Sequence, residues 1–127
     1  MGHTHVTATV TNLQKSKPGY TAPFLVDTGA IVCLAPGVEL TKAGIEVEGR
    51  EAYELANGTP VEYEFGFARL SFMGSDTVTK IIFGPDGVEP LLGVTALESV
   101  GIGVDPVSQT LKRYAALPLK GQPGATR

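Results

Sequence analysis

Short runs of alternating polar and apolar residues, separated by glycine and proline, dominate this sequence. From Thr4 to Val10 the apolar residues Val6, Ala8 and Val10 share one parity, which is the pattern of a half-buried strand. The chain has 16 Gly and 9 Pro in 127 residues, which predicts many tight turns between short elements. No long segment has a helical period, so we expect an all-β fold within a single domain.

A hairpin is predicted around Asn57-Gly58, because both residues tolerate the positive φ of a tight turn. In the strand that follows, the apolar residues change parity between Phe67 and Ala68. A change of parity within one strand predicts a β-bulge at that point.

Helical signals are confined to two short segments. Residues 36–43 can hold one or two helical turns, with Gly44 as their C-terminal stop. Thr95 and Glu98 form a capping-box pattern, which predicts a helix over residues 95–100. We expect a last strand over residues 111–117, a domain over residues 1–119 and a flexible tail over residues 120–127.

Composition narrows the classes of function. Ten basic and thirteen acidic side chains give a formal net charge of −3 without a basic cluster, which argues against nucleic acid as a partner. No apolar run is long enough for a membrane span, and the N-terminus lacks the apolar core of a signal peptide. The single Cys33 excludes an internal disulfide, fits a reducing cytoplasm and is expected to be a buried, inert thiol.

The segment from Phe24 to Ala30 carries the chemistry. Asp27 follows an apolar run and precedes Thr28 and Gly29, so the carboxylate stands at the end of a predicted strand. A burial-prone carboxylate is unusual there, because an unpaired buried charge is costly. Thr28 can donate a hydrogen bond, and Gly29 allows close approach of another chain or a ligand.

This segment resembles the pepsin-like and retroviral-type aspartic proteases. Their signature is two apolar residues, then Asp-Thr/Ser-Gly-Ala/Ser, which Leu25 to Ala30 matches in full. A later family element, two apolar residues and Gly before a helix, is matched by Leu91-Leu92-Gly93. In element order the chain looks closest to small single-domain bacterial relatives of the retroviral (retropepsin-like) enzymes. This resemblance implies a closed β-barrel with a flap hairpin and one short C-terminal helix.

The resemblance implies a homodimer, since the chain has one such signature where pepsin-like chains have two. Asp27 of each chain would meet at a two-fold axis and form the catalytic dyad of an endopeptidase. The two carboxylates would share a proton and activate water, without a metal or other cofactor.

The resemblance also implies roles for the neighbouring residues. Active-site support would come from Thr28, Gly29 and Ala30. A flap tip over the peptide substrate would be formed by Ala56, Asn57, Gly58 and Thr59. Leu92 and Gly93 would back the catalytic loop and belong to the substrate-binding residues, with Leu92 touching a specificity pocket. Ile31 departs from the retroviral pattern, which has Asp at that position, so substrate anchoring is expected to differ.

Two alternatives stay open. A catalytically silent dimer of the same fold would bind peptides or partner proteins without cutting them. A small β-barrel of unrelated function would be monomeric, with Asp27 in an ordinary turn.

Other polar residues have simpler interpretations. His3 and His5 are expected to be exposed, since no ligand cluster accompanies them. Six glutamates between residues 46 and 64 are expected to form the solvated outer face of the hairpin. These are Glu46, Glu48, Glu51, Glu54, Glu62 and Glu64.

Overall fold

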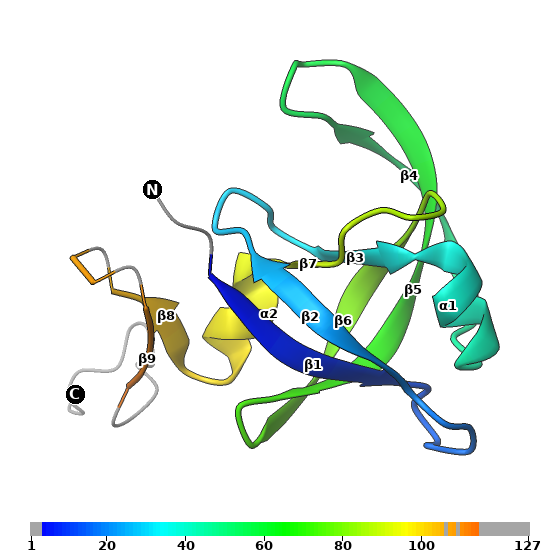
Figure 1. Ribbon diagram of the computed structural model, residues 1–127. Helices are drawn as coiled ribbons and strands as arrows, with labels where there is room; N and C mark the ends of the chain where they lie inside the picture. The colour runs from blue at the N-terminus through cyan, green and yellow to red at the C-terminus, as the bar shows by residue number, and fades with distance from the viewer. Residues whose placement is uncertain (1–3, 106, 109, 115–127) are drawn as a thin grey trace, which may run out of the picture.

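The computed structural model describes residues 4–105, 107–108 and 110–114. Its main sheet consists of β1 (His5–Thr11), β2 (Tyr20–Val26), β3 (Cys33–Pro36), β4 (Gly49–Glu54), β5 (Pro60–Phe72), β6 (Ser75–Gly84) and β7 (Leu91–Leu92). The strand order is β1-β2-β7-β3-β6-β5-β4, and β1 also pairs with β5. Six strands therefore close into a barrel, and β4 extends from it as the outer partner of β5 (Figure 1). The predicted all-β barrel is confirmed.

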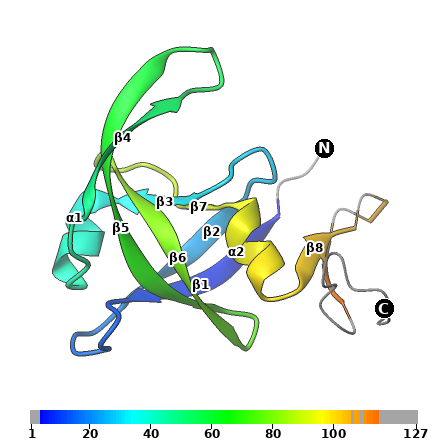
Figure 2. The ribbon, with the colours of Figure 1, turned by 180° about the vertical axis from the view of Figure 1, so that it is seen from behind.

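Two short helices and a small sheet complete the described residues. Helix α1 spans Gly37–Lys42, and helix α2 spans Val94–Ser99. The helices flank the barrel on opposite sides, and β8 (Ile102–Val104) and β9 (Leu111–Arg113) pair beyond α2 (Figure 2). None of the described helices has the length and apolar character needed to cross a bilayer.

The predicted elements mostly fall where the sequence placed them. The helix expected over residues 95–100 is α2, and the segment 36–43 contains α1, after which Gly44 has φ +84°. The last strand is present over residues 111–113. Residues 115–117 of that prediction, the domain end at 119 and the tail 120–127 lie outside the described residues.

The barrel interior is filled by apolar side chains from every barrel strand and both helices. Ala8 and Val10 of β1 are fully buried, as their shared parity predicts. The largest fully buried side chains are Phe24, Leu40, Leu70, Ile81, Leu92, Leu97 and Ile102. Phe24 thus anchors β2 in the core three residues before Asp27.

The predicted bulge at Phe67-Ala68 is wrong. Strand β5 pairs with β6 in unbroken register across this point, from Phe65 to Phe72. Gly66 and Ala68 face the core, whereas Phe65 and Phe67 lie on the opposite, outer face. The apolar side chains change face because β5 leaves the barrel on its way into the hairpin, so no extra residue is needed.

The hairpin turn is longer than the two residues Asn57-Gly58. A five-residue loop joins β4 to β5, closed by the Leu55 amide donating to the Thr59 carbonyl at 2.9 Å. Gly58 has φ +86°, and the Asn57 side chain accepts from the Thr59 amide at 2.9 Å. Both predicted turn residues are used, but only the glycine adopts positive φ.

Phe24→Ala should test how far the barrel core supports the end of β2. We expect the variant to lose about 3–5 kcal/mol in free energy of unfolding, because a fully buried ring is deleted. Urea denaturation at one fixed protein concentration measures this. Val78→Ala, at a side chain that is 50% exposed, should change stability by less than about 0.5 kcal/mol. Equal losses in the two variants would contradict the assigned core.

Candidate active site

Asp27 begins a tight loop directly after β2. Its amide donates to the Leu92 carbonyl at 3.1 Å, and its own carbonyl accepts from the Ala30 amide at 3.0 Å. The Gly29 amide donates to the Asp27 carboxylate at 3.0 Å. The half-buried carboxylate is therefore fixed to its own loop and still reaches solvent.

Strand β7 lies between the two segments that flank this loop. Leu91 and Leu92 pair in parallel with Leu25 and Val26 of β2, and Leu91 pairs with Leu34 of β3 on the other side. The loop between β2 and β3 is thus closed at its base by a strand from much later in the chain. Leu92 therefore lies directly behind the loop of Asp27.

Gly93 sits against the same loop with no room for a side chain. A Cβ atom there would lie 2.6 Å from the Val32 carbonyl oxygen. The Gly93 amide donates to the Cys33 sulfur at 3.4 Å. Glycine is required here by close backbone packing, because nothing larger fits between β7 and the loop.

Helix α2 fixes the other end of the loop, and in doing so it corrects the capping-box prediction. Gly93 is the N-cap residue and makes no side-chain cap bond. The amides of Val94 and Thr95 donate instead to the carbonyls of Ala30 and Ile31, at 2.8 and 3.2 Å. Loop carbonyls satisfy the first helical amides, so the box formed by Thr95 and Glu98 is not used.

Of the predicted site residues, Asp27, Gly29, Ala30, Leu92 and Gly93 form this one unit. Thr28 is exposed in the loop, and its role across a dimer stays a prediction. Residues 56–59 lie apart, in the turn of the β4–β5 hairpin, which curves toward the side of the barrel where the loop after β2 projects (Figure 1).

Ile31 presents its side chain to solvent beside this unit. It is 71% exposed, although its carbonyl is held by the Thr95 amide. An isoleucine held in solvent by a fixed backbone forgoes the gain of burial, which is about 1.5–3 kcal/mol for such a side chain. The sequence does not predict this exposure, because Ile31 and Val32 belong to an apolar run that is typical of buried residues.

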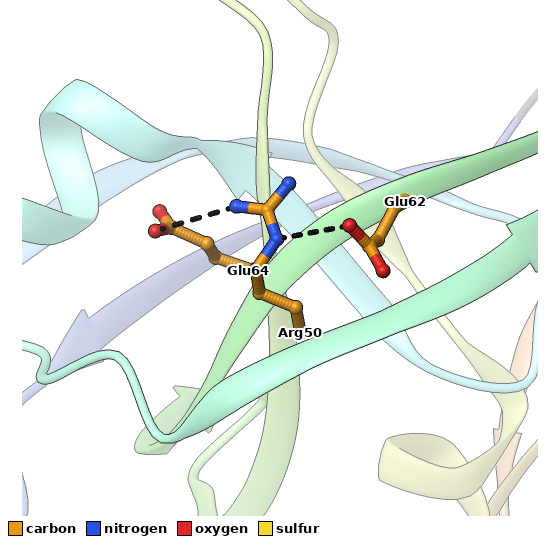
Figure 3. Close-up of polar contacts among 3 residues, drawn as sticks. All are labelled: Arg50, Glu62 and Glu64. Carbon is orange, nitrogen blue, oxygen red and sulfur yellow. Dashed lines mark hydrogen bonds and ion pairs between the residues drawn. The ribbon is translucent and has the colours of Figure 1, made fainter.

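The glutamates of the hairpin occupy both of its faces. Arg50 pairs with Glu62 at 3.1 Å and with Glu64 at 3.7 Å, joining β4 to β5 (Figure 3). This triad has the parity of the core-facing Gly66, whereas Glu51 shares the opposite face with Tyr63 and Phe65. The glutamates are solvated, as expected, but not confined to one outer face.

On that opposite face, Lys80 of β6 forms an ion pair with Glu51 of β4. The Tyr53 hydroxyl also donates to the Glu51 carboxylate, at 3.1 Å. The bond from Lys80 lowers the pKa of Glu51 below its usual value. Burial, together with the bond to Glu51, raises the pKa of Tyr53 to about 12.

Two other titratable residues considered as candidates, Cys33 and His5, make structural contacts. Burial raises the pKa of the Cys33 thiol to about 11, and the bond from the Gly93 amide offsets this only in part. His5 pairs with Glu89 at 2.8 Å, and His3 lies outside the described residues. Within the described part of the chain, no three potential metal ligands gather.

Neither the protein-family models nor the curated proteins contain a match to this sequence. The chemistry of the site therefore follows from its residues alone. Asp27 offers one carboxylate, and among the described residues its hydrogen-bond donor is the Gly29 amide. One carboxylate cannot act as acid and base at once, so acid–base hydrolysis at this loop needs a second group in addition to Asp27.

Gly93→Ala should disturb the loop of Asp27 from behind. The new Cβ would press on the Val32 carbonyl, so we expect a loss of about 1–3 kcal/mol in free energy of unfolding. Gly29→Ala is the matched control within the same unit, because its Cβ would meet only the Asp27 carboxylate, at 3.3 Å. Thermal denaturation compares the two. A Gly93→Ala variant as stable as Gly29→Ala would show that β7 can move away from the loop.

Cys33 should resist alkylation in the folded protein. Because its pKa is about 11, the thiol is almost wholly neutral at pH 8, and it is also inaccessible. We expect iodoacetamide to modify Cys33 slowly at pH 8 and rapidly in denaturant, measured by intact mass. Lys42→Cys supplies a control thiol on the exposed face of α1, which should react without denaturant. Fast modification of both cysteines in native protein would contradict the buried position.

Proposed function

We propose that this chain is one subunit of a homodimeric aspartic endopeptidase, with Asp27 as its catalytic carboxylate. One observation carries the proposal: the carboxylate stands at the end of a barrel strand, on a loop fixed by Leu92, Gly93 and α2. The segment Leu25–Ala30 that supplies it resembles the aspartic-protease signature. An ordinary surface turn would not need bracing from two later elements.

The chemistry follows from bringing two copies of Asp27 together. Carboxylates about 3 Å apart cannot both ionise, so they hold one proton between them. The ionised carboxylate accepts a proton from a bound water, and the protonated one donates toward the carbonyl of the scissile peptide bond. The pair titrates as a unit, so activity should follow a bell-shaped pH profile.

The substrate in this proposal is an extended segment of a peptide or protein. It would lie between the loop of Asp27 and the turn formed by residues 56–59 and would pair its backbone with these as an added strand. Gly29 would accept from the substrate main chain. No nucleic acid, membrane or cofactor enters the proposal, and the unpaired, buried Cys33 supports a reducing cytoplasm as its location.

A peptide-binding dimer without catalysis is the second candidate. The exposed side chain of Ile31 favours it, because an apolar group in the loop between β2 and β3 offers a contact for peptide side chains. In that case peptides would bind and Asp27 would have no chemical task.

Asp27→Asn decides between the two candidates. If Asp27 is catalytic, cleavage of a peptide library should fall by on the order of 10³-fold, because the variant has no proton acceptor. The control is Asp76→Asn, which changes the Asp of an Asp-Thr pair that lacks the following Gly, and it should cleave normally. Mass spectrometry of the products measures both variants. Undiminished cleavage by Asp27→Asn would end the proposal, and peptide binding without cleavage by either protein would favour the second candidate.

Mixed dimers test whether two chains share the site. Asp27→Asn subunits and unaltered subunits, unfolded together in equal amounts and refolded, should form active dimers in only about one quarter of cases. Activity per total protein should then fall to about a quarter of that of the unaltered enzyme, whereas independent monomers would retain half. Sedimentation velocity on the same samples confirms the dimer, and activity at the one-half level would argue for single-chain sites.

A further inference from the structure

The β4–β5 hairpin leaves the barrel as a ribbon of only two strands. Strand β6 pairs with β5 from Phe65 to Phe72, so residues 60–64 of β5 pair with β4 alone. A two-stranded ribbon is marginally stable by itself. Its direction over the barrel must therefore be set by contacts at its base.

Lys80 makes a side-chain contact that crosses from the barrel to the hairpin. It lies on β6 opposite Phe67, yet its ammonium pairs with Glu51 on β4, a strand that β6 does not touch in the sheet order. The same ammonium stands 4.3 Å from the centre of the Phe65 ring. Lys80 therefore reaches over β5 and clamps β4 and β5 to the barrel at the point where they leave it.

The Lys80 contact continues up the hairpin. Glu51 also accepts from the Tyr53 hydroxyl, and the Tyr53 ring lies 6.4 Å from that of Tyr63 on the paired strand. The Lys80 side chain is 26% exposed and that of Glu51 is 45% exposed, so the ion pair is shielded from water only at its Lys80 end. A displacement at Lys80 would thus be transmitted along one face of the ribbon.

The opposite face offers a natural comparison. There Arg50 pairs with Glu62 and Glu64, and these ion pairs join β4 to β5 (Figure 3). They stiffen the ribbon internally without tying it to β6. Two cationic side chains of one hairpin base thus have different structural tasks.

We propose that Lys80 is a positioning residue, which sets the angle of the β4–β5 hairpin relative to the loop of Asp27 and thereby how tightly an extended peptide is held. The link to peptide rests on the proposed function, whereas the link to the hairpin angle does not. Lys80 would act through Glu51 and Phe65 and would not touch the reacting atoms.

Spin labels measure the hairpin angle without any need for catalysis. Labels at Asn57→Cys in the turn and Lys42→Cys on α1 report one distance within a chain, when labelled chains are diluted in excess unlabelled protein. Lys80→Met should broaden this distance distribution, and Lys80→Arg, which keeps the charge, should restore it. Arg50→Met should leave the distribution centred as in the unaltered protein. An unchanged distribution in Lys80→Met would overturn the proposal.

Kinetics test the consequence for peptide. In chains without labels, Lys80→Met should raise KM by about two- to fivefold with little change in kcat, since the ion pair of Lys80 is weak and remote from the chemistry. Lys80→Arg should return KM toward the original value. A broadened distribution with unchanged KM would overturn the claim that the hairpin angle governs peptide affinity. If the protein does not cleave peptides, the Kd of a bound peptide is measured in place of KM. The cleavage assay of Asp27→Asn tests the catalytic proposal separately.

Melting temperatures test whether Lys80→Met broadens the distance distribution only because it destabilises the barrel. Lys80→Met keeps the aliphatic stem, so the barrel should melt within a few degrees of the original protein. Glu51→Gln removes the other partner of the ion pair and should reproduce the broadened distribution. The double variant should be no broader than either single one, because both break the same contact. Additive effects of the two substitutions would contradict a shared clamp.

Discussion

The hydrogen bond from the Asp27 amide to the Leu92 carbonyl is the contact on which the organisation of the site depends. It is formed because β7 inserts between β2 and β3, so that residues distant in sequence close the base of one loop. Helix α2 follows directly after β7, and its first amides donate hydrogen bonds to the carbonyls of Ala30 and Ile31. Both ends of the loop are held by backbone, and the Asp27 carboxylate, which accepts from the Gly29 amide, still reaches solvent.

Close packing explains why glycine occurs where segments cross. At Gly93 a side chain would collide with the Val32 carbonyl, and at Gly66 it would lie 2.3 Å from the Glu46 carbonyl. Gly66 lies at the level where β5 begins its pairing with β6, so the chain before β4 can pass directly over it. The site and the base of the hairpin are thus set by approaches of backbone to backbone that only glycine permits.

The charged side chains of the hairpin help to hold it together, which the net charge of the chain does not reveal. The glutamates lie on both faces of the hairpin. The two cationic side chains that form ion pairs with them come from different elements, Arg50 from β4 and Lys80 from β6. One cation joins the two strands of the ribbon, and the other joins the ribbon to the barrel. A count of acidic residues would suggest a repulsive surface, whereas their placement makes part of that charge cohesive.

Several sequence predictions failed for one physical reason, which is that a local pattern has more than one tertiary solution. The parity change near Phe67 suggested a bulge, but β5 instead passes from a barrel environment into a hairpin. Thr95 and Glu98 suggested a capping box, but carbonyls of the loop after β2 reached the helical amides first. The ion pair of Lys80 with Glu51 had no sequence signal, since neither spacing nor strand order could be known.

By itself the sequence determined the all-β class, the alternating pattern of β1, the turn at Asn57-Gly58 and the place of Asp27 at the end of a strand. Alternation and turn residues act over a few neighbouring positions, so the chain carries that information locally. Only the tertiary structure decided which segments brace the loop, which face of the hairpin each charge occupies, and that Ile31 faces solvent. These depend on contacts between residues far apart in the chain, and closure of the barrel, not local pattern, brings such residues together.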